Sequence, residues 1–201
     1  MHGGLKSRMT ESNQPYVWLI SGCSTGFGRE IALSALEAGD IVGVTSRNID
    51  DIADICKQYP STSIPLSLDV TDASQIQKCV DMMIKNFEKI DVLVNNAGYG
   101  YLSAIEEGES HEVKNLFETN FFGALELTKK VLPHMRHKKF GRIINNSSQA
   151  GLMANPGTGY YSASKFALEG LMEALDKEVR PLNIAAVSYT HPRAHETLLD
   201  L

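Results

Sequence analysis

Two residues in the C-terminal part of the sequence have side chains suited to proton transfer. Tyr161 and Lys165 stand four positions apart in a segment with helical periodicity, so they share one face of a helix. A tyrosine hydroxyl has an unperturbed pKa of about 10, and lowering that pKa to neutral pH takes about 4 kcal/mol of stabilisation of the phenolate. One positive charge roughly 4 Å away supplies energy of that order at the effective dielectric of a partly buried site. The pair therefore predicts an acid–base centre, with an exposed pair on an amphipathic helix as the alternative.

A glycine-rich turn between a predicted strand and a predicted helix indicates a second functional element. The apolar run at 17–20 is typical of a strand buried in a parallel sheet, and residues 29–38 have helical spacing. Glycines between such elements let the backbone approach a pyrophosphate, which the helix N-terminus binds through its amides. We therefore predict a dinucleotide-binding turn, with a glycine-rich loop of no special function as the alternative. Its candidate cofactor-binding residues are Gly22, Ser24, Gly26, Phe27 and Gly28.

The end of the next predicted strand, at 41–46, indicates which dinucleotide binds. In dinucleotide-binding folds an acid about 20 residues beyond the glycine turn holds the ribose 2'-hydroxyl, whereas an arginine accommodates a 2'-phosphate. Here the acid is missing and Arg47 is present, and a guanidinium binds phosphate through two hydrogen bonds. We therefore predict NADP(H), with NAD(H) as the alternative cofactor. Arg47 could instead pair with Asp50 or Asp51 on a solvated loop.

Two further predicted strands, at 63–68 and 90–94, also end in polar or small residues. Asp69 and Val70 follow the first strand, and the run Asn-Asn-Ala-Gly at 95–98 follows the second. Small residues and side-chain amides at such a position suit close approach to a ligand. The alternative for Asp69 is a carboxylate in the capping region before a helix that runs from Thr71 or Asp72 to Phe87. The alternative for the 95–98 run is a turn held by local Asn hydrogen bonds.

The remaining candidates lie on a long predicted helix and at the end of a fifth strand. The helical pattern covers about 110–136 and contains Asn120, a mildly poor helix former that is either functional or a satisfied polar residue at a helix contact. The fifth strand begins at Gly141 and runs into Ser147 and Ser148. A sixth strand is predicted over 183–187.

The alternation of strands and helices predicts an α/β protein. We expect a Rossmann-type doubly wound parallel sheet in a three-layer αβα sandwich, incomplete at the C-terminus. The domain extends over 16–187 and follows a flexible N-terminal extension at 1–15. Ligand then binds at the carboxyl ends of the strands, where the glycine turn, the 95–98 run and Ser148 all fall.

Composition narrows the classes of partner. A net charge of -5 and a pI near 5.7 give no general attraction to nucleic acid or to an anionic membrane. Three widely spaced cysteines, no recognisable signal peptide and no apolar run long enough to cross a bilayer indicate a reduced, cytoplasmic protein that acts on a small molecule. His134 and His137 lack both a metal-site spacing and acidic companions, so we predict no metal.

Together these motifs carry a family resemblance. The turn Ser21-Gly-x-x-x-Gly-x-Gly, the Asn-Asn-Ala-Gly run, a serine thirteen positions before Tyr161, and the Tyr-x-x-x-Lys pair resemble the classical short-chain dehydrogenase/reductase family. Ser21 stands where the family has threonine, which keeps the hydroxyl. The resemblance covers about residues 16–187.

The resemblance implies hydride transfer between the nicotinamide dinucleotide and an alcohol or carbonyl carbon. Tyr161 gives its proton to the substrate oxygen, Ser148 positions that oxygen, and Lys165 stabilises the phenolate and holds the nicotinamide ribose. Asn120 takes the family's water-holding position. The implied cofactor contacts beyond the glycine turn are Arg47, Asp69, Val70, Asn96, Ala97, Gly98, Tyr161 and Lys165. Homo-oligomer formation through the two long helices is implied as well.

A second class of function stays open: a dinucleotide-binding redox sensor or regulatory protein with little turnover. Such a protein keeps the glycine turn and Arg47 but has lost catalysis. We rank it below the enzyme because Tyr161, Lys165, Ser148 and Asn120 are all present.

The last fourteen residues depart from the family pattern. The family follows its sixth strand with a Pro-Gly turn, which is absent from 188–201. That segment also resembles translated sequencing-adapter strings, so we expect a non-native tail on a truncated reductase. An authentic short extension is the alternative.

Overall fold

The fold is built on one sheet of six parallel β-strands. The computed structural model describes residues 14–190, so the expectations for 1–13 and 191–201 lie outside the described residues. The strands are β1 (Val17–Ile20), β2 (Ile41–Ser46), β3 (Ser63–Ser67), β4 (Val92–Asn95), β5 (Gly141–Asn146) and β6 (Ile184–Tyr189). The α-helices are α1 (Gly26–Glu37), α2 (Ala53–Gln58), α3 (Ala73–Phe87), α4 (Ser110–Phe117), α5 (Ala124–Lys138) and α6 (Gly159–Val179).

All six strands pair in parallel in the order β3-β2-β1-β4-β5-β6. The chain first moves outward from β1 to β3 and then crosses back to β4, so β1 and β4 flank the point where the strand order reverses. Open α/β sheets bind ligands beside that reversal, at the carboxyl ends of the strands. This topology confirms the predicted Rossmann-type doubly wound sheet.

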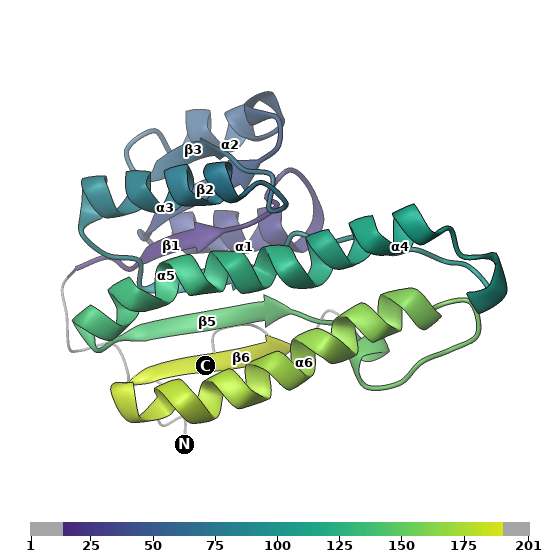
Figure 1. The fold of residues 1–201 in the computed structure, drawn as a ribbon. Coiled ribbons are helices and arrows are strands. Elements are labelled where there is room, and N and C mark those ends of the chain that lie inside the picture. Colours follow the sequence, from purple (N-terminus) through teal and green to yellow (C-terminus); the bar gives the residue numbers. More distant parts are fainter. Residues whose placement is uncertain (1–13, 191–201) are drawn as a thin grey trace, which may run out of the picture.

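Helices cover both faces of the sheet, which gives the three predicted layers (Figure 1). Side chains of α3, α5 and α6 pack on one face around Leu93 and Ile143, which are completely buried. Side chains of α1 and α2 pack on the other face around Ile20 and Val44. Burying one Leu or Ile side chain contributes about 1.5–3 kcal/mol, so the two apolar layers dominate the stability of the fold.

Helix α3 starts as the sequence predicts. Asp72 is its N-cap and accepts hydrogen bonds from the backbone amides of Ser74 and Gln75 at 2.8 and 3.2 Å. Hydrogen bonds from the side chains of Ser74 and Gln75, together with those amides, lower the pKa of the Asp72 carboxyl to about 2. The cap is therefore charged at neutral pH.

The predicted long helix over 110–136 is divided in the structure. Between α4 and α5 lies the π-helical segment η3 (Glu118–Gly123), which contains Asn120. A Cβ atom added at Gly123 would lie 2.7 Å from the Val70 side chain, so glycine lets this segment approach the end of β3. The sequence predicted a single helix because η3 is a short π-helical turn between α4 and α5, within helical backbone that continues from Ser110 to Lys138.

Two other elements differ from expectation. The 3-10 turn η1 (Ile49–Ile52) and helix α2 follow β2 and were not predicted. Strand β6 continues to Tyr189, two residues past the predicted domain boundary, and the Tyr189 carbonyl accepts a 2.9 Å hydrogen bond from the amide of Ser147.

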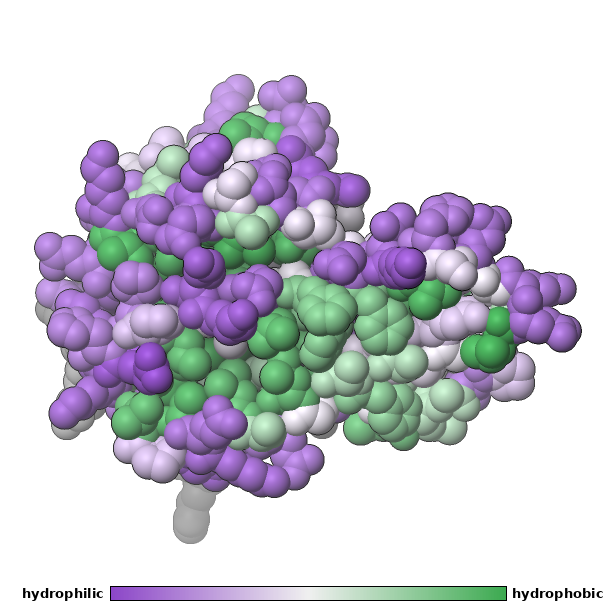
Figure 2. All heavy atoms as spheres, viewed as in Figure 1, coloured by the Kyte–Doolittle hydropathy of each residue, from purple (hydrophilic) through white to green (hydrophobic). Residues whose placement is uncertain are grey.

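Apolar residues gather on the face that carries α5 and α6 (Figure 2). Phe122 and Phe166 are exposed at 44% and 46% of their surface. Exposed apolar areas of this kind often mark contacts between proteins, and the homo-oligomer expected from the two long helices stays a prediction. Within residues 14–190, no helix has the length and apolar character needed to span a membrane.

Candidate active site

The predicted site residues all lie at the carboxyl edge of the sheet. The glycine turn follows β1, Arg47 follows β2, Asp69 and Val70 follow β3, and Asn96, Ala97 and Gly98 follow β4. Ser148 follows β5, and α6 carries Tyr161 and Lys165 past the same edge (Figure 1). With Asn120 of η3, which contacts the loop after β4, the arrangement collects residues from seven separate chain segments.

The turn from β1 to α1 has no room for larger residues at its centre. A Cβ atom added at Gly28 would lie 2.2 Å from the Gly22 carbonyl oxygen and 2.3 Å from the Asn96 Nδ2 atom. Gly26 has a φ of +62°, in the left-handed region that favours glycine, and nothing lies within 4 Å of its missing Cβ. Close packing at Gly28 and open space at Gly26 are what a dinucleotide turn requires.

The N-terminus of α1 is suited to an anion. Thr25 is the N-cap residue, but its side chain makes no capping hydrogen bond within the described part of the chain, and the first turn contains no acidic residue. The first amides of this helix thus keep their positive electrostatic character. These features fit the pyrophosphate of a nicotinamide dinucleotide, which Gly22, Gly26 and the first turn of α1 would hold.

Ser21 and Asn96 join the glycine turn to the loop after β4. The Ser21 hydroxyl accepts hydrogen bonds from the amides of Asn96 and Ala97 at 2.9 and 3.0 Å and donates one to the Val94 carbonyl. The Asn96 side chain donates to the carbonyls of Ser21 and Gly22. The hydroxyl that serine shares with threonine therefore has a structural purpose here, and the Asn96 amide works mainly as a brace.

Arg47 is exposed just beyond β2. Within residues 14–190 no ion pair joins it to Asp50 or Asp51, although Asp51 accepts a 3.4 Å hydrogen bond from Ser46. The structure therefore does not contain the alternative, an ion pair between Arg47 and one of those acids. The nearby ion pair joins Arg29 of α1 to Asp54 of α2.

Asp69 uses its carboxylate locally. Its Oδ1 atom accepts hydrogen bonds from the amide and the hydroxyl of Thr71 at 2.9 and 2.7 Å. Val70 is buried and packs against η3. These contacts give Asp69 the capping-region role weighed as an alternative, and the predicted contacts of Asp69 and Val70 with the cofactor stay predictions.

Lys165 is a buried cation beside Tyr161. The residue is only 6% exposed, and its ammonium donates a 2.8 Å hydrogen bond to the Asn146 carbonyl. The Nζ atom lies 5.8 Å from the centre of the Tyr161 ring, so the two side chains share one face of α6 as predicted. Burial lowers the pKa of Lys165 to about 8, while the negative charge of Glu169 acts in the opposite direction. At neutral pH the lysine is mostly charged.

Both polar atoms of the Asn120 side chain form hydrogen bonds with neighbouring groups. Its Oδ1 atom accepts from the Tyr99 amide at 3.0 Å, and its Nδ2 atom donates to the Tyr99 carbonyl at 2.9 Å and to Ser164 at 3.3 Å. A Cβ atom added at Gly98 would lie 3.0 Å from Asn120 Oδ1 and 3.8 Å from Lys165 Nζ. Asn120 therefore holds the loop after β4 against the lysine, and its predicted water-holding role stays a prediction.

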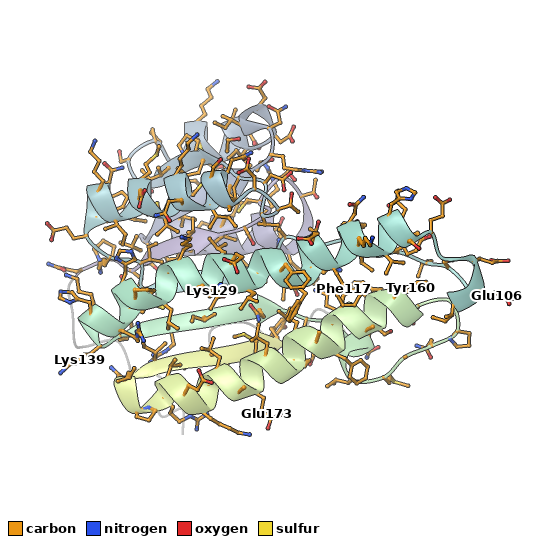
Figure 3. The ribbon with its side chains drawn as sticks, viewed as in Figure 1. Glu106, Phe117, Lys129, Lys139, Tyr160 and Glu173 are labelled. Atoms are coloured by element: carbon orange, nitrogen blue, oxygen red, sulfur yellow. The ribbon has the colours of Figure 1, made fainter. Side chains whose placement is uncertain are left out.

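The adjacent Tyr160 has a different environment. Its hydroxyl donates a 2.5 Å hydrogen bond to the Ile105 carbonyl, and its ring packs against Gly108 and Tyr101. Figure 3 shows Tyr160 between α4 and α6, toward η2 (Ile105–Glu107) and away from the sheet. Tyr160 fixes a surface loop, which leaves Tyr161 as the tyrosine that accompanies Lys165.

Ser148 caps the short turn η4 (Gln149–Gly151). Its Oγ atom accepts a 3.2 Å hydrogen bond from the Ala150 amide. This bond orients the side chain but uses acceptor capacity, so the hydroxyl proton is available for another oxygen. Its neighbour Ser147 is buried.

Two supporting residues, Asn145 and Asn146, have no recognisable sequence signal of their own. Asn146 gives its carbonyl to Lys165 and donates from Nδ2 to Asn96 Oδ1 at 2.9 Å, which connects the lysine to the glycine turn. Asn95 and Asn145 are opposite each other on β4 and β5 and share a 2.7 Å hydrogen bond. In the described part of the chain, no group of three or more His, Cys, Asp or Glu side chains could hold a metal ion.

Comparison with known proteins agrees with this geometry. The family model for short chain dehydrogenase matches residues 16–199. A curated relative, 3-ketodihydrosphingosine reductase of Bacteroides thetaiotaomicron, is 43% identical over 175 residues, which is 85% of this chain and 61% of the relative.

Solved structures give the same picture. A short-chain dehydrogenase from Streptomyces avermitilis has a TM-score of 0.86 and 41% identity, covering 88% of this chain and 65% of that one. The protein ElxO, solved with NADP bound, has a TM-score of 0.82 and 30% identity, covering 87% of this chain and 72% of that one. The chain spans between 50% and 62% of the length of the curated relatives it matches.

Proposed function

The chain belongs to the short-chain dehydrogenase family, and on that premise we propose that it transfers a hydride between NADP(H) and the carbon of an alcohol or carbonyl group. The observation that carries the proposal is the buried ammonium of Lys165, bound to the Asn146 carbonyl and facing the Tyr161 ring. A buried, incompletely paired cation is costly to a fold, so its position next to a phenol favours a catalytic purpose.

The proposed residue roles follow the charge changes of the reaction. The bound dinucleotide supplies or accepts the hydride. In carbonyl reduction, the substrate oxygen becomes negative and takes the Tyr161 proton, while Ser148 donates a hydrogen bond to that oxygen. The phenolate left on Tyr161 is stabilised by the positive charge of Lys165. In alcohol oxidation, the same groups move the proton in the reverse direction.

Arg47 supports NADP(H) over NAD(H). Its guanidinium stands exposed at the carboxyl end of β2, and no ion pair within the described residues ties it to Asp50 or Asp51. A 2'-phosphate placed there would gain a charge-assisted contact. NAD(H) remains the alternative cofactor.

Exposed apolar side chains on the two loops beside Ser148 and Gly98 indicate a class of substrate. Leu102 is 73% exposed, and Leu152 and Met153 are 64% and 59% exposed. The amide of Ser103 donates a 2.9 Å hydrogen bond to the Gly157 carbonyl, which joins these loops. We propose a ketone with an apolar chain, in keeping with the 3-ketodihydrosphingosine named for the bacterial relative.

A turnover assay tests this function. Purified protein is mixed with NADPH and a series of 3-keto compounds whose alkyl chains increase in length, and loss of NADPH absorbance is followed. We expect oxidation of NADPH that becomes more efficient with chain length. Binding of NADPH, seen as a fluorescence change, without its consumption by any ketone would favour the regulatory alternative.

A further inference from the structure

Glu169 is an acidic residue of α6 that the proposed chemistry does not use. It stands one helical turn beyond Lys165, and its Oε1 atom is buried without a hydrogen-bond partner among residues 14–190. The next acid on the helix, Glu173, instead has a 72% exposed side chain and pairs with Lys177. A carboxylate oxygen withdrawn from water is unfavourable unless a nearby charge compensates it.

The side chains of Glu169, Lys165 and Ser147 converge under η4. A Cβ atom added at Gly151 would lie 3.0 Å from Ser147 Oγ, 3.2 Å from Glu169 Cγ and 3.3 Å from Lys165 Cβ. The Ser147 hydroxyl is also buried without a partner in the described region. Glu169 therefore lies directly behind the turn that presents Ser148.

Few charges act on the Lys165 ammonium. The groups that other elements place near Nζ are uncharged: the Asn146 carbonyl after β5, the Gly98 backbone after β4, and the Asn120 amide on η3. On its own helix the titratable neighbours are Tyr161 and Glu169. Burial lowers the pKa of Lys165, and the charge of Glu169 raises it.

We propose that Glu169 is a positioning residue whose carboxylate keeps Lys165 in its ammonium form. It acts through the lysine and does not touch the substrate. The catalytic value of this arrangement rests on the proposed function, because a neutral lysine would no longer stabilise a Tyr161 phenolate. The ionisation itself can be measured without any substrate.

The test compares Glu169→Gln with Glu173→Gln, which removes a carboxylate from the same helix one turn farther from Lys165. Figure 3 shows Glu173 on the outer side of α6. Protein with isotope-labelled lysine side chains is titrated by NMR, and the Lys165 signal is assigned by its loss in Lys165→Arg. We expect the Lys165 midpoint to fall by about half a pH unit or more in Glu169→Gln, as a nearby charge in a partly buried site requires. Glu173→Gln should leave it in place, and Glu169→Asp should give an intermediate value.

The results separate this inference from the proposed function. An unchanged Lys165 midpoint in Glu169→Gln, or an equal fall in Glu173→Gln, would overturn the assignment to Glu169. If the enzyme turns over, the alkaline limb of its pH profile should move down by the same amount in Glu169→Gln, which a purely structural role of Glu169 does not predict. Absence of turnover with every ketone counts against the proposed function, and the titration still decides the role of Glu169.

Discussion

The glycine turn after β1 and the cluster around Lys165 occupy the same edge of the sheet but are built in opposite ways. The turn depends on missing side chains: Gly28 leaves no room for a Cβ atom, and Gly26 leaves open space at the first residue of α1. The cluster depends on side chains that partner one another, with Lys165 held by Asn146 and Asn120 held by Tyr99. The first region offers backbone to a ligand, and the second supplies a charge. Changes in the two regions should therefore fail in different ways.

The largest effect should come from Tyr161→Phe in the side-chain cluster. The change keeps the ring and removes the transferable proton, so turnover should fall by about 10²–10⁴-fold. NADPH binding, measured by fluorescence, should stay close to that of the unmodified protein. Tyr160→Phe is the matched control, because it loses only the bond to Ile105 and should keep most activity. The opposite pattern would assign the chemistry to Tyr160.

Gly28→Ala should affect the backbone region next. The new methyl group meets the Gly22 carbonyl and the Asn96 side chain at close range, and overpacking of this kind costs about 1–3 kcal/mol. If the strain falls on the bound state, NADPH affinity drops by about 10- to 100-fold, and if it falls on the fold, the melting temperature drops. Gly170→Ala is the control, since nothing lies within 4 Å of its missing Cβ. Unchanged affinity and melting temperature in Gly28→Ala would contradict the tight turn.

Arg47→Asp sharpens the comparison within the cofactor region. It replaces a donor for the 2'-phosphate by an acceptor for the 2'-hydroxyl, so the ratio of NADPH to NADH affinity should fall by about tenfold or more. The two dissociation constants are measured by titration of protein fluorescence. Equal constants for both cofactors in the unmodified protein would remove Arg47 from the site.

The smallest effect concerns stability at Lys165. The pKa of Lys165 is about 8 in the fold, below the ordinary value of 10.5. The unfolded chain therefore binds the ammonium proton more tightly than the folded protein does. Burial of the charged lysine thus destabilises the fold at pH values below about 8. Lys165→Met should raise stability at pH 7 by about 1–3 kcal/mol, less the lost bond to Asn146.

The advantage of Lys165→Met should decrease as pH rises from about 8 toward 10.5, because the unmodified lysine loses its charge in the fold over that window. Melting curves of both proteins between pH 7 and pH 10 give the measurement. If the stability difference between the two proteins stayed constant across this range, the buried charge of Lys165 would not be the cause of that difference.

The sequence was most informative where local pattern and chemistry coincide. Strands β1, β4 and β5 are short apolar runs that end in distinctive residues, and the cap at Asp72 has a single clear helix after it. The sheet and the shared edge follow from these. The candidate residues were thereby assigned to strand ends that the structure places side by side.

The parts that sequence could not predict depend on contacts between distant segments. Helix α2 was missed because no side-chain cap marks its start: Asn48, whose side chain accepts a hydrogen bond from the Asp50 amide, caps the preceding turn η1 instead. The bracing roles of Asn96 and Asn120 depend on the loop after β4 reaching β1 and η3. No local sequence pattern indicates that this loop contacts those two segments.

The wide turn at η3 makes the site sensitive to the number of residues in the chain as well as to their identity. One residue turns an α-helix by about 100°, so deleting a single residue from Glu118–Gly123 would restore a regular helix and rotate Asn120 away from Tyr99. Insertion of one codon can create such a turn during evolution, and deletion of one codon can remove it. Among relatives, a one-residue gap at this position would therefore mark a rearranged lysine environment even where every catalytic side chain is retained.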